Sequence, residues 1–153
     1  MIQAELLRRY PFFGGLTEAQ LSGIAMIADE VGFNKGTVIG EEDKPSTKFY
    51  LLTEGSVDLL YSGGGEGRIS NSLVGEVAPG EVFAFSALIE PYCLTTTLRA
   101  AEDVCAVAVD AAGLRAMCEV DTRLGYVLMR NLSRMVMERL DGVRVQLAAC
   151  QTP

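Results

Sequence analysis

The sequence predicts a mainly β domain, an antiparallel sandwich or barrel, between N-terminal helices and a long C-terminal helix. From Val31 to Val109, short apolar runs alternate with turn residues, which is typical of antiparallel strands. On both sides of this region, apolar residues recur at spacings of three and four, which indicates helices. The chain has 153 residues, enough for one domain with its own core. We therefore expect a single domain, with helices over 1–30, strands over 31–109 and helices over 110–150.

The N-terminal region predicts two helices. Residues 3–9 form a short amphipathic pattern that ends before Pro11, because the residue preceding a proline disfavours helical geometry. Thr17 is followed three residues later by Gln20, which is the spacing of a capping box. A second helix is therefore expected from about residue 18 to about residue 28.

The central region predicts about eight short strands, because its apolar runs are bounded by Gly, Pro, Asn and Asp. The runs are VGF, TVI, KFYLL, SVDLLY, RISNSLVGEV, EVFAF, LTTTLRA and VCAVAV. The segment SGGGEG at 62–67 is expected to be a hairpin tip exposed to solvent. Cys105 lies in the run VCAVAV, where we expect it to fill the core as a small apolar side chain.

The C-terminal region predicts a short helix followed by a long one. Asp110 is placed to cap a helix that runs through Cys118, and Asp121 is placed to cap another over 122–148. At about 1.5 Å per residue, the second helix would be roughly 40 Å long. Glycine weakens a helix, so a bend is expected near Asp141-Gly142.

The long helix carries an apolar seam with alternating spacings near three and four, which resembles that of a coiled coil. We expect one side of this helix to cover the β domain and the other side to meet a second copy of the chain. We therefore predict that the chain forms a homodimer through this helix. The residues of the predicted seam are Leu128, Leu132, Met135, Val136, Leu140, Val143 and Leu147.

The composition excludes several function classes. The net charge is −7, whereas nucleic-acid binding needs a basic face. No apolar run approaches the roughly 20 residues of a membrane span, and the N-terminus is too polar for a signal peptide, so a cytoplasmic location is expected. There is no His, which removes His-dependent catalysis and His-rich metal sites. The four cysteines form no CxxC, so we expect no metal, no cofactor and no enzymatic activity.

Five segments, taken in order, resemble the cyclic nucleotide-binding domain, the sensor of the catabolite activator family and of cyclic-nucleotide-regulated kinases and channels. They are YPFFGGLTEAQLSGIA, FNKGTVI, KFYLLTEGSVDLLY with its turn residue Gly55, VAPGEVFAFSALI, and LTTTLRA. The resemblance covers roughly residues 10–148. It implies an antiparallel β-roll or jelly roll (a double-stranded β-helix) with a regulatory role in signal transduction. It also implies a phosphate-binding cassette after the sixth strand.

The cassette departs from the family pattern at three positions. The family has Phe-Gly-Glu, a helical turn and then an Arg, where the Glu holds the ribose and the Arg pairs the cyclic phosphate. Here the Gly, Glu and Arg positions are Ala84, Phe85 and Leu94. We therefore expect that cyclic AMP and cyclic GMP do not bind in the family manner. The candidate pocket positions are Phe83, Ala84, Phe85, Ser86, Ala87, Leu88, Leu94, Thr95 and Thr96.

Three interpretations of this region remain open. The cassette is collapsed core in a dimeric scaffold, a pocket adapted to a more apolar small ligand, or a weak cyclic-nucleotide site that uses backbone amides. A thiol redox sensor built on Cys93 and Cys150 is a further alternative. The sensor usually precedes a helix-turn-helix, but this sequence ends at Pro153, so we expect a stand-alone domain whose output passes through its dimer or a protein partner.

Overall fold

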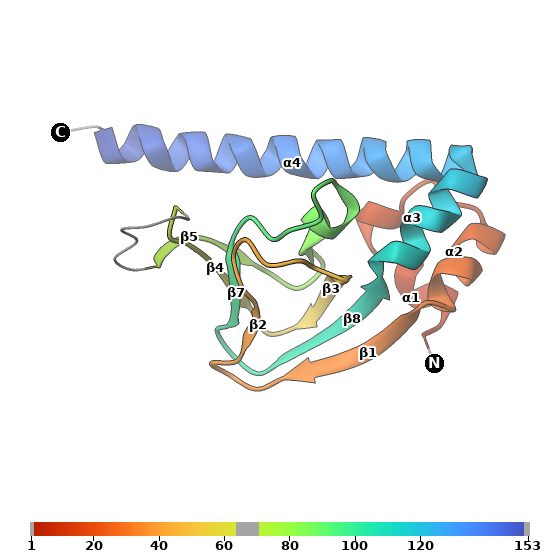
Figure 1. Cartoon of the computed structure of the whole chain (residues 1–153), viewed down its shortest axis with the longest axis horizontal. Helices are drawn as coiled ribbons and strands as arrows, with labels where there is room; N and C mark the ends of the chain where they lie inside the picture. Colours follow the sequence, from red (N-terminus) through yellow and green to blue (C-terminus); the bar gives the residue numbers. More distant parts are fainter. Residues whose placement is uncertain (1, 64–70, 152–153) are drawn as a thin grey trace.

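The computed structural model describes residues 2–63 and 71–151, and these residues form an antiparallel β-roll flanked by helices (Figure 1). One sheet has the strand order β1-β8-β3-β6 and the other has the order β2-β7-β4-β5. The predicted fold class is confirmed. The strands are β1 (Ala28–Phe33), β2 (Val38–Gly40), β3 (Lys48–Glu54), β4 (Val57–Tyr61), β5 (Ser72–Val77), β6 (Val82–Phe83), β7 (Thr97–Ala100) and β8 (Val104–Asp110).

The helices lie before and after the roll, apart from one 3-10 turn between β6 and β7. They are α1 (Ala4–Arg8), η1 (Pro11–Phe13), α2 (Glu18–Ala25), η2 (Phe85–Leu88), α3 (Ala111–Val120) and α4 (Thr122–Gln151). In Figure 1, α4 extends over the roll, and the green segment that carries η2 lies beneath it. Most of the predicted Gly-rich hairpin tip at 62–67 lies outside the described residues.

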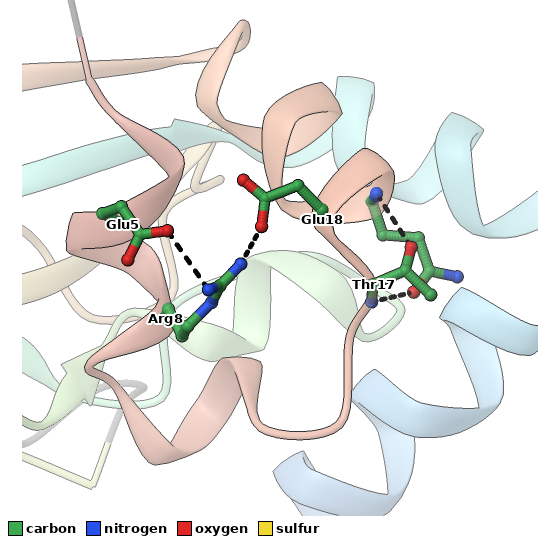
Figure 2. A network of polar contacts seen from close by, with 5 residues as sticks. Glu5, Arg8, Thr17 and Glu18 are labelled. Carbon is green, nitrogen blue, oxygen red and sulfur yellow. Dashed lines mark hydrogen bonds and ion pairs between the residues drawn. The ribbon is translucent and has the colours of Figure 1, made fainter.

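Local side-chain contacts fix the start of α2. The capping box is confirmed: Thr17 accepts a hydrogen bond from the backbone of Gln20, and the Gln20 side chain accepts one from the backbone of Thr17. Figure 2 shows this pair, together with Arg8 of α1 between Glu5 and Glu18. The two ion pairs of Arg8 are exposed and contribute little to stability.

The end of α2 differs from the prediction. The helix stops at Ala25 rather than near residue 28, and the roll begins at Ala28 rather than at Val31. The carbonyl of Ile27 accepts a hydrogen bond from Asp110, and Ala28 pairs with Val109 of β8. Pairing with a strand that is distant in the sequence therefore overrides the helical apolar pattern here.

The β-roll corrects the prediction for Cys105. This residue is exposed, whereas its neighbours Val104 and Ala106 are buried. Successive side chains of a strand point to opposite faces, and Cys105 lies on the solvent face opposite Gly32 and Glu54. The expectation that Cys105 fills the core was therefore wrong, because composition alone does not fix which face a residue occupies.

The C-terminal helices begin where they were predicted. Asp110 accepts a hydrogen bond from the backbone of Gly113, and Asp121 accepts one from the backbone of Leu124. Helix α4 has 30 residues and continues without interruption through Gly142, so the predicted bend is absent. Glycine lowers helix stability but keeps its backbone N–H, so the hydrogen-bond ladder need not break. Within the described residues, no helix combines the length and the apolar character that crossing a membrane requires.

Two clusters of buried apolar side chains form the core. The helix-side core lies between the helices and one sheet, and its fully buried members include Leu7, Phe13, Leu21, Ile24, Phe49, Leu51, Leu114, Leu124 and Leu128. The roll core lies between the two sheets and includes Leu52, Val57, Val77, Phe83, Leu94 and Leu98. Buried residues of α4 lie only between Leu124 and Leu132, so its C-terminal part leaves room for a cavity above the roll.

Candidate ligand site between helix α4 and the β-roll

The cassette keeps the backbone shape that a glycine would favour. Ala84 has φ 60° and ψ 28°, which is the left-handed helical region. This conformation costs an L-residue about 1–2 kcal/mol, because Cβ approaches the following carbonyl oxygen. The turn at Ala84 leads directly from β6 into η2. Ala84, which is predicted to stand where the family has glycine, thus adopts a conformation that glycine favours.

The nine predicted cassette positions fall into three environments. Phe83, Ala84 and Leu94 belong to the roll core, whereas Ala87 and Leu88 belong to the helix-side core. The remaining four are less buried: Phe85, Ser86 and Thr96 are half-buried, and Thr95 is exposed. The ring of Phe83 stacks on that of Tyr50, with centroids 4.9 Å apart. Most of the cassette therefore packs into the protein rather than facing an open pocket.

Leu94, which the sequence resemblance predicts to stand at the position of the family's phosphate-binding arginine, is a core residue. It is 6 % exposed, and its Cδ1 lies 2.5 Å from the place that a Cβ on Gly40 would occupy. Its backbone N–H donates to the carbonyl of Lys44, and its carbonyl accepts from Asp43. The side chain at this position therefore contributes apolar packing and no positive charge.

Phe85, which the sequence resemblance predicts to stand at the position of the family's ribose-binding glutamate, lies beneath a cation from α4. The guanidinium carbon of Arg139 is 5.2 Å from the centroid of the Phe85 ring. Burial lowers the pKa of Arg139, and the nearby carboxylate of Glu81 partly opposes this effect. A guanidinium stacks favourably on an aromatic face, so this contact ties α4 to the cassette.

A second arginine holds the cassette from the other side. Nη1 of Arg115, in α3, donates to the carbonyl of Ala87 at 2.5 Å, and its guanidinium lies 3.9 Å from the ring centroid of Tyr92. Sequence reasoning missed this residue. Nothing in the local sequence distinguishes it from an ordinary surface arginine, because both of its partners lie more than 20 positions away.

A cavity of about 530 Å³ lies between α4 and the roll. The roll supplies the apolar side chains of Leu59, Val74 and Val82, together with the polar ones of Glu76, Glu81 and Thr96. The wall contributed by α4 is of mixed polarity and consists of Asn131, Arg134, Met135, Glu138, Arg139, Gly142, Val143 and Gln146. Of the nine predicted cassette positions, only Thr96 lines this cavity. The cavity is therefore built mainly from residues outside the predicted set.

The sequence contains a pattern from which the helical wall of the cavity could have been predicted. Met135, Arg139, Gly142 and Gln146 follow one another at spacings of four, three and four, so they share one face of a helix. Their mixed polarity made the stripe less conspicuous than the apolar seam beside it.

The structure divides the predicted dimer seam. Leu128 and Leu132 are buried against the helix-side core, and Met135 packs on that core and lines the cavity. The other four residues are 44–58 % exposed: Val136, Leu140, Val143 and Leu147. The N-terminal part of the seam therefore packs within the domain, whereas its C-terminal part is exposed, with Val143 also lining the cavity.

The four cysteines are free thiols. Cys93 is half-buried in the cassette, and Cys150 is exposed near the end of α4. Burial, followed by the neighbouring carboxylates of Asp121 and Glu119, raises the pKa of Cys118. A raised pKa disfavours the thiolate, which is the reactive form of cysteine.

Comparison with known proteins agrees with this architecture. The sequence profile of the cyclic nucleotide-binding domain matches residues 30–121. A CRP-like cAMP-activated global transcriptional regulator from Mycobacterium tuberculosis is 25 % identical over 134 residues, which are 85 % of this chain and 58 % of that protein. The chain thus spans little more than half the length of this curated relative.

Two solved structures show the same fold. One is described as a cyclic nucleotide-binding protein from Geobacter metallireducens GS-15. It is 42 % identical with a TM-score of 0.82, and the match covers 92 % of this chain and 99 % of that one. The other is a triple mutant of the regulatory subunit of a cAMP-independent protein kinase A from Trypanosoma brucei, bound to cAMP in its A site. It is 19 % identical with a TM-score of 0.74, and the match covers 94 % of this chain and 49 % of that one. The chain belongs to the cyclic nucleotide-binding domain family, whose members have a regulatory, sensor-type fold.

Proposed function

We propose that this chain is a non-enzymatic sensor domain whose cavity binds a small, largely apolar molecule in place of a cyclic nucleotide bound in the family manner. One observation carries the proposal. A cavity of about 530 Å³ is present between α4 and the roll, whereas the two cassette positions that would hold a cyclic nucleotide are Phe85 and Leu94. Cavities of roughly 300–1,000 Å³ with mostly apolar walls are typical of small-molecule sites.

The cassette disfavours a cyclic phosphate. Loss of one partner from a buried, hydrogen-bonded charge pair costs about 2–5 kcal/mol. This corresponds to roughly thirty-fold to several-thousand-fold weaker binding. At position 94 the leucine side chain packs in the roll core, close to Gly40. The fold itself does not require a response to cAMP, since a regulatory subunit described as cAMP-independent has it too.

The cavity also favours a pocket over a collapsed site. In a collapsed site the space between α4 and the roll would be filled by side chains, yet the helical wall at Gly142 has no other group within 4 Å of a Cβ built there. A ligand in this space would contact both the roll and α4. Such a ligand shifts the position of α4 only if it binds one position better than the other.

The output of the sensor is proposed to pass through a second copy of the chain. Val136, Leu140, Val143 and Leu147 form an exposed apolar stripe on α4, and their spacings of four, three and four fit a coiled-coil seam. A homodimer through this stripe would transmit the position of α4 to the partner subunit. Sedimentation at tens of micromolar should give a dimer, and Leu140→Lys with Leu147→Lys should give a monomer of unchanged helicity. A monomeric wild-type chain would contradict the homodimer. The stripe would then be available to a different protein partner.

A thermal-shift screen tests the ligand proposal. A fragment library is screened alongside cyclic AMP and cyclic GMP, with Gly142→Phe as the control that fills the cavity. A ligand at a hundredfold its Kd stabilises the fold by about 2.7 kcal/mol, which shifts Tm by roughly 5–10 °C in a protein of this size. We expect a fragment to stabilise the wild type and not Gly142→Phe, and we expect the two nucleotides to give no shift. Stabilisation by cyclic AMP alone would contradict the proposal.

Restoring the cassette tests the assignment of its positions. Phe85→Glu combined with Leu94→Arg should gain binding of cyclic AMP, measured by calorimetry. No gain in a double variant that keeps the circular dichroism of the wild type would show that these positions do not correspond to the family's ribose and phosphate contacts.

A further inference from the structure

Arg139 is a half-buried cation with unused hydrogen-bond donors. Its guanidinium lies over the Phe85 ring, and the residue is part of the cavity wall. In the part of the chain that the structure describes, no hydrogen bond or ion pair engages this guanidinium. A guanidinium has five N–H donors in a planar fork that matches a carboxylate or a phosphate. Arg139 therefore presents an anion-binding group to the cavity while its planar face is held by the ring.

Among the charged residues that line the cavity, Arg139 is half-buried, whereas the others are exposed to solvent. These exposed residues are Arg134, Glu76, Glu81 and Glu138. Glu81 interacts electrostatically with Arg139, and its Oε1 also accepts a hydrogen bond from the backbone N–H of Ala78 at 2.7 Å. Exposed carboxylates are screened by solvent and salt, whereas a half-buried guanidinium is screened less.

The opposite wall contributes apolar side chains. Leu59, Val74 and Val82 line the cavity from the roll, and Thr96 adds one half-buried hydroxyl among them. A molecule whose apolar part lies on this wall and whose charged end points to α4 would satisfy both surfaces.

We infer that the cavity binds a small molecule with a flat apolar body and one anionic group, which the guanidinium of Arg139 holds. The inference rests on the proposed function, because it assigns the ligand class of the same cavity. It also moves the cation that pairs with the anion from the segment before β7, where Leu94 stands, to helix α4. The ligand's charge then links the roll directly to the helix that faces the proposed partner subunit.

Two fluorescent probes of nearly identical shape test the inference. 8-Anilinonaphthalene-1-sulfonate carries a sulfonate, and N-phenyl-1-naphthylamine has the same ring system without it. Both are titrated into the wild type, Arg139→Gln, Gly142→Phe and Arg144→Gln. Arg144 is the matched control, since it is an exposed arginine on the same helix that does not line the cavity.

We expect Arg139→Gln to weaken binding of the sulfonate probe by about tenfold to a hundredfold, with the uncharged probe changed by less than about twofold. Arg144→Gln should leave both affinities unchanged, and Gly142→Phe should abolish both. Equal affinity of the sulfonate probe for the wild type and Arg139→Gln would refute the anion site at Arg139 but not the proposed ligand pocket. Binding of neither probe to the wild type overturns the pocket as well. Unchanged binding of the sulfonate probe to Gly142→Phe places it outside the cavity and also overturns the inference.

Discussion

Asn131 is the buried polar residue that fixes α4 to the N-terminal segment. It is 5 % exposed, and its side-chain amide donates to the carbonyls of Phe12 and Gly14, both at 2.9 Å. Asn131→Ala removes both hydrogen bonds and leaves the two carbonyls without this donor. Two net hydrogen bonds of about 1 kcal/mol each, plus the desolvation of the Phe12 carbonyl, give an expected loss of about 2–4 kcal/mol. This loss lowers Tm by roughly 5–15 °C in a protein of this size.

Asn131→Asp is a more specific test, because an ionised aspartate has nearly the shape of asparagine but no N–H donors. The introduced carboxylate would face two carbonyl oxygens in a buried site, so its folded-state pKa is raised above the unfolded value. A raised pKa favours folding below the unfolded pKa, and this contribution is lost as pH rises through the folded pKa. The deficit of Asn131→Asp relative to Asn131→Ala should therefore grow from acidic to neutral pH.

The measurement is urea unfolding followed by circular dichroism at several pH values, since the chain has no Trp for fluorescence. Asn131→Gln serves as a second variant that keeps the amide but displaces it. If Asn131→Ala and Asn131→Asp both unfold within about 0.5 kcal/mol of the wild type, the two hydrogen bonds do not hold α4 and the reasoning fails. A pH-independent difference between the two variants would refute the electrostatic part alone.

Three further predictions concern the cassette, a helix cap and a thiol. Arg115→Leu should destabilise the fold by about 1–3 kcal/mol, because it removes a hydrogen bond to a backbone carbonyl and a cation–π contact. A double-mutant cycle with Tyr92→Leu checks this through a non-zero coupling energy, and additive effects would contradict it. The pKa of Asp121 is lowered by its hydrogen bonds to a glutamine side chain and to the first turn of α4. The Tm deficit of Asp121→Ala should therefore be complete above the ordinary Asp pKa and shrink as pH falls through the lowered one. A deficit that stays constant down to acid pH would show that the charge plays no part. Iodoacetamide should label Cys118 more slowly than Cys150 at neutral pH, because burial and nearby carboxylates raise the pKa of Cys118. Equal labelling rates, measured by mass spectrometry, would refute this reasoning.

Helix starts were predictable because the signals that set them are local. Thr17 and Gln20 are three residues apart, and Asp110 and Asp121 each accept a hydrogen bond from a backbone three residues ahead. Such contacts form in almost any surrounding, so the sequence pattern predicts them. The end of α2 was not predictable in this way. Ala28 lies in a strand because it pairs with Val109, which is 81 positions away.

The sequence predicts which residues form the cassette, but it does not predict the contacts that these residues make. The turn at Ala84 and the apolar residues Phe85 and Leu94 follow from the order of motifs along the chain. That the Arg139 guanidinium covers the Phe85 ring depends on how α4 is rotated about its axis. Packing of the buried apolar side chains in the first part of α4 sets this rotation, and their periodicity does not encode which face meets the cassette.

The sequence by itself determined the fold class and the capped helix starts, and it predicts that the cassette lacks the family's two ligand-binding side chains. Each of these depends on residue types at short spacings or on motifs in a fixed order. The tertiary structure alone decided that a cavity of about 530 Å³ lies beneath α4 and that Arg139 lines it. It also decided that Cys105 faces solvent and that the dimer seam divides between the core and the surface. The physical reason is that volume and orientation arise where distant elements pack together, and no segment of the sequence contains that geometry on its own.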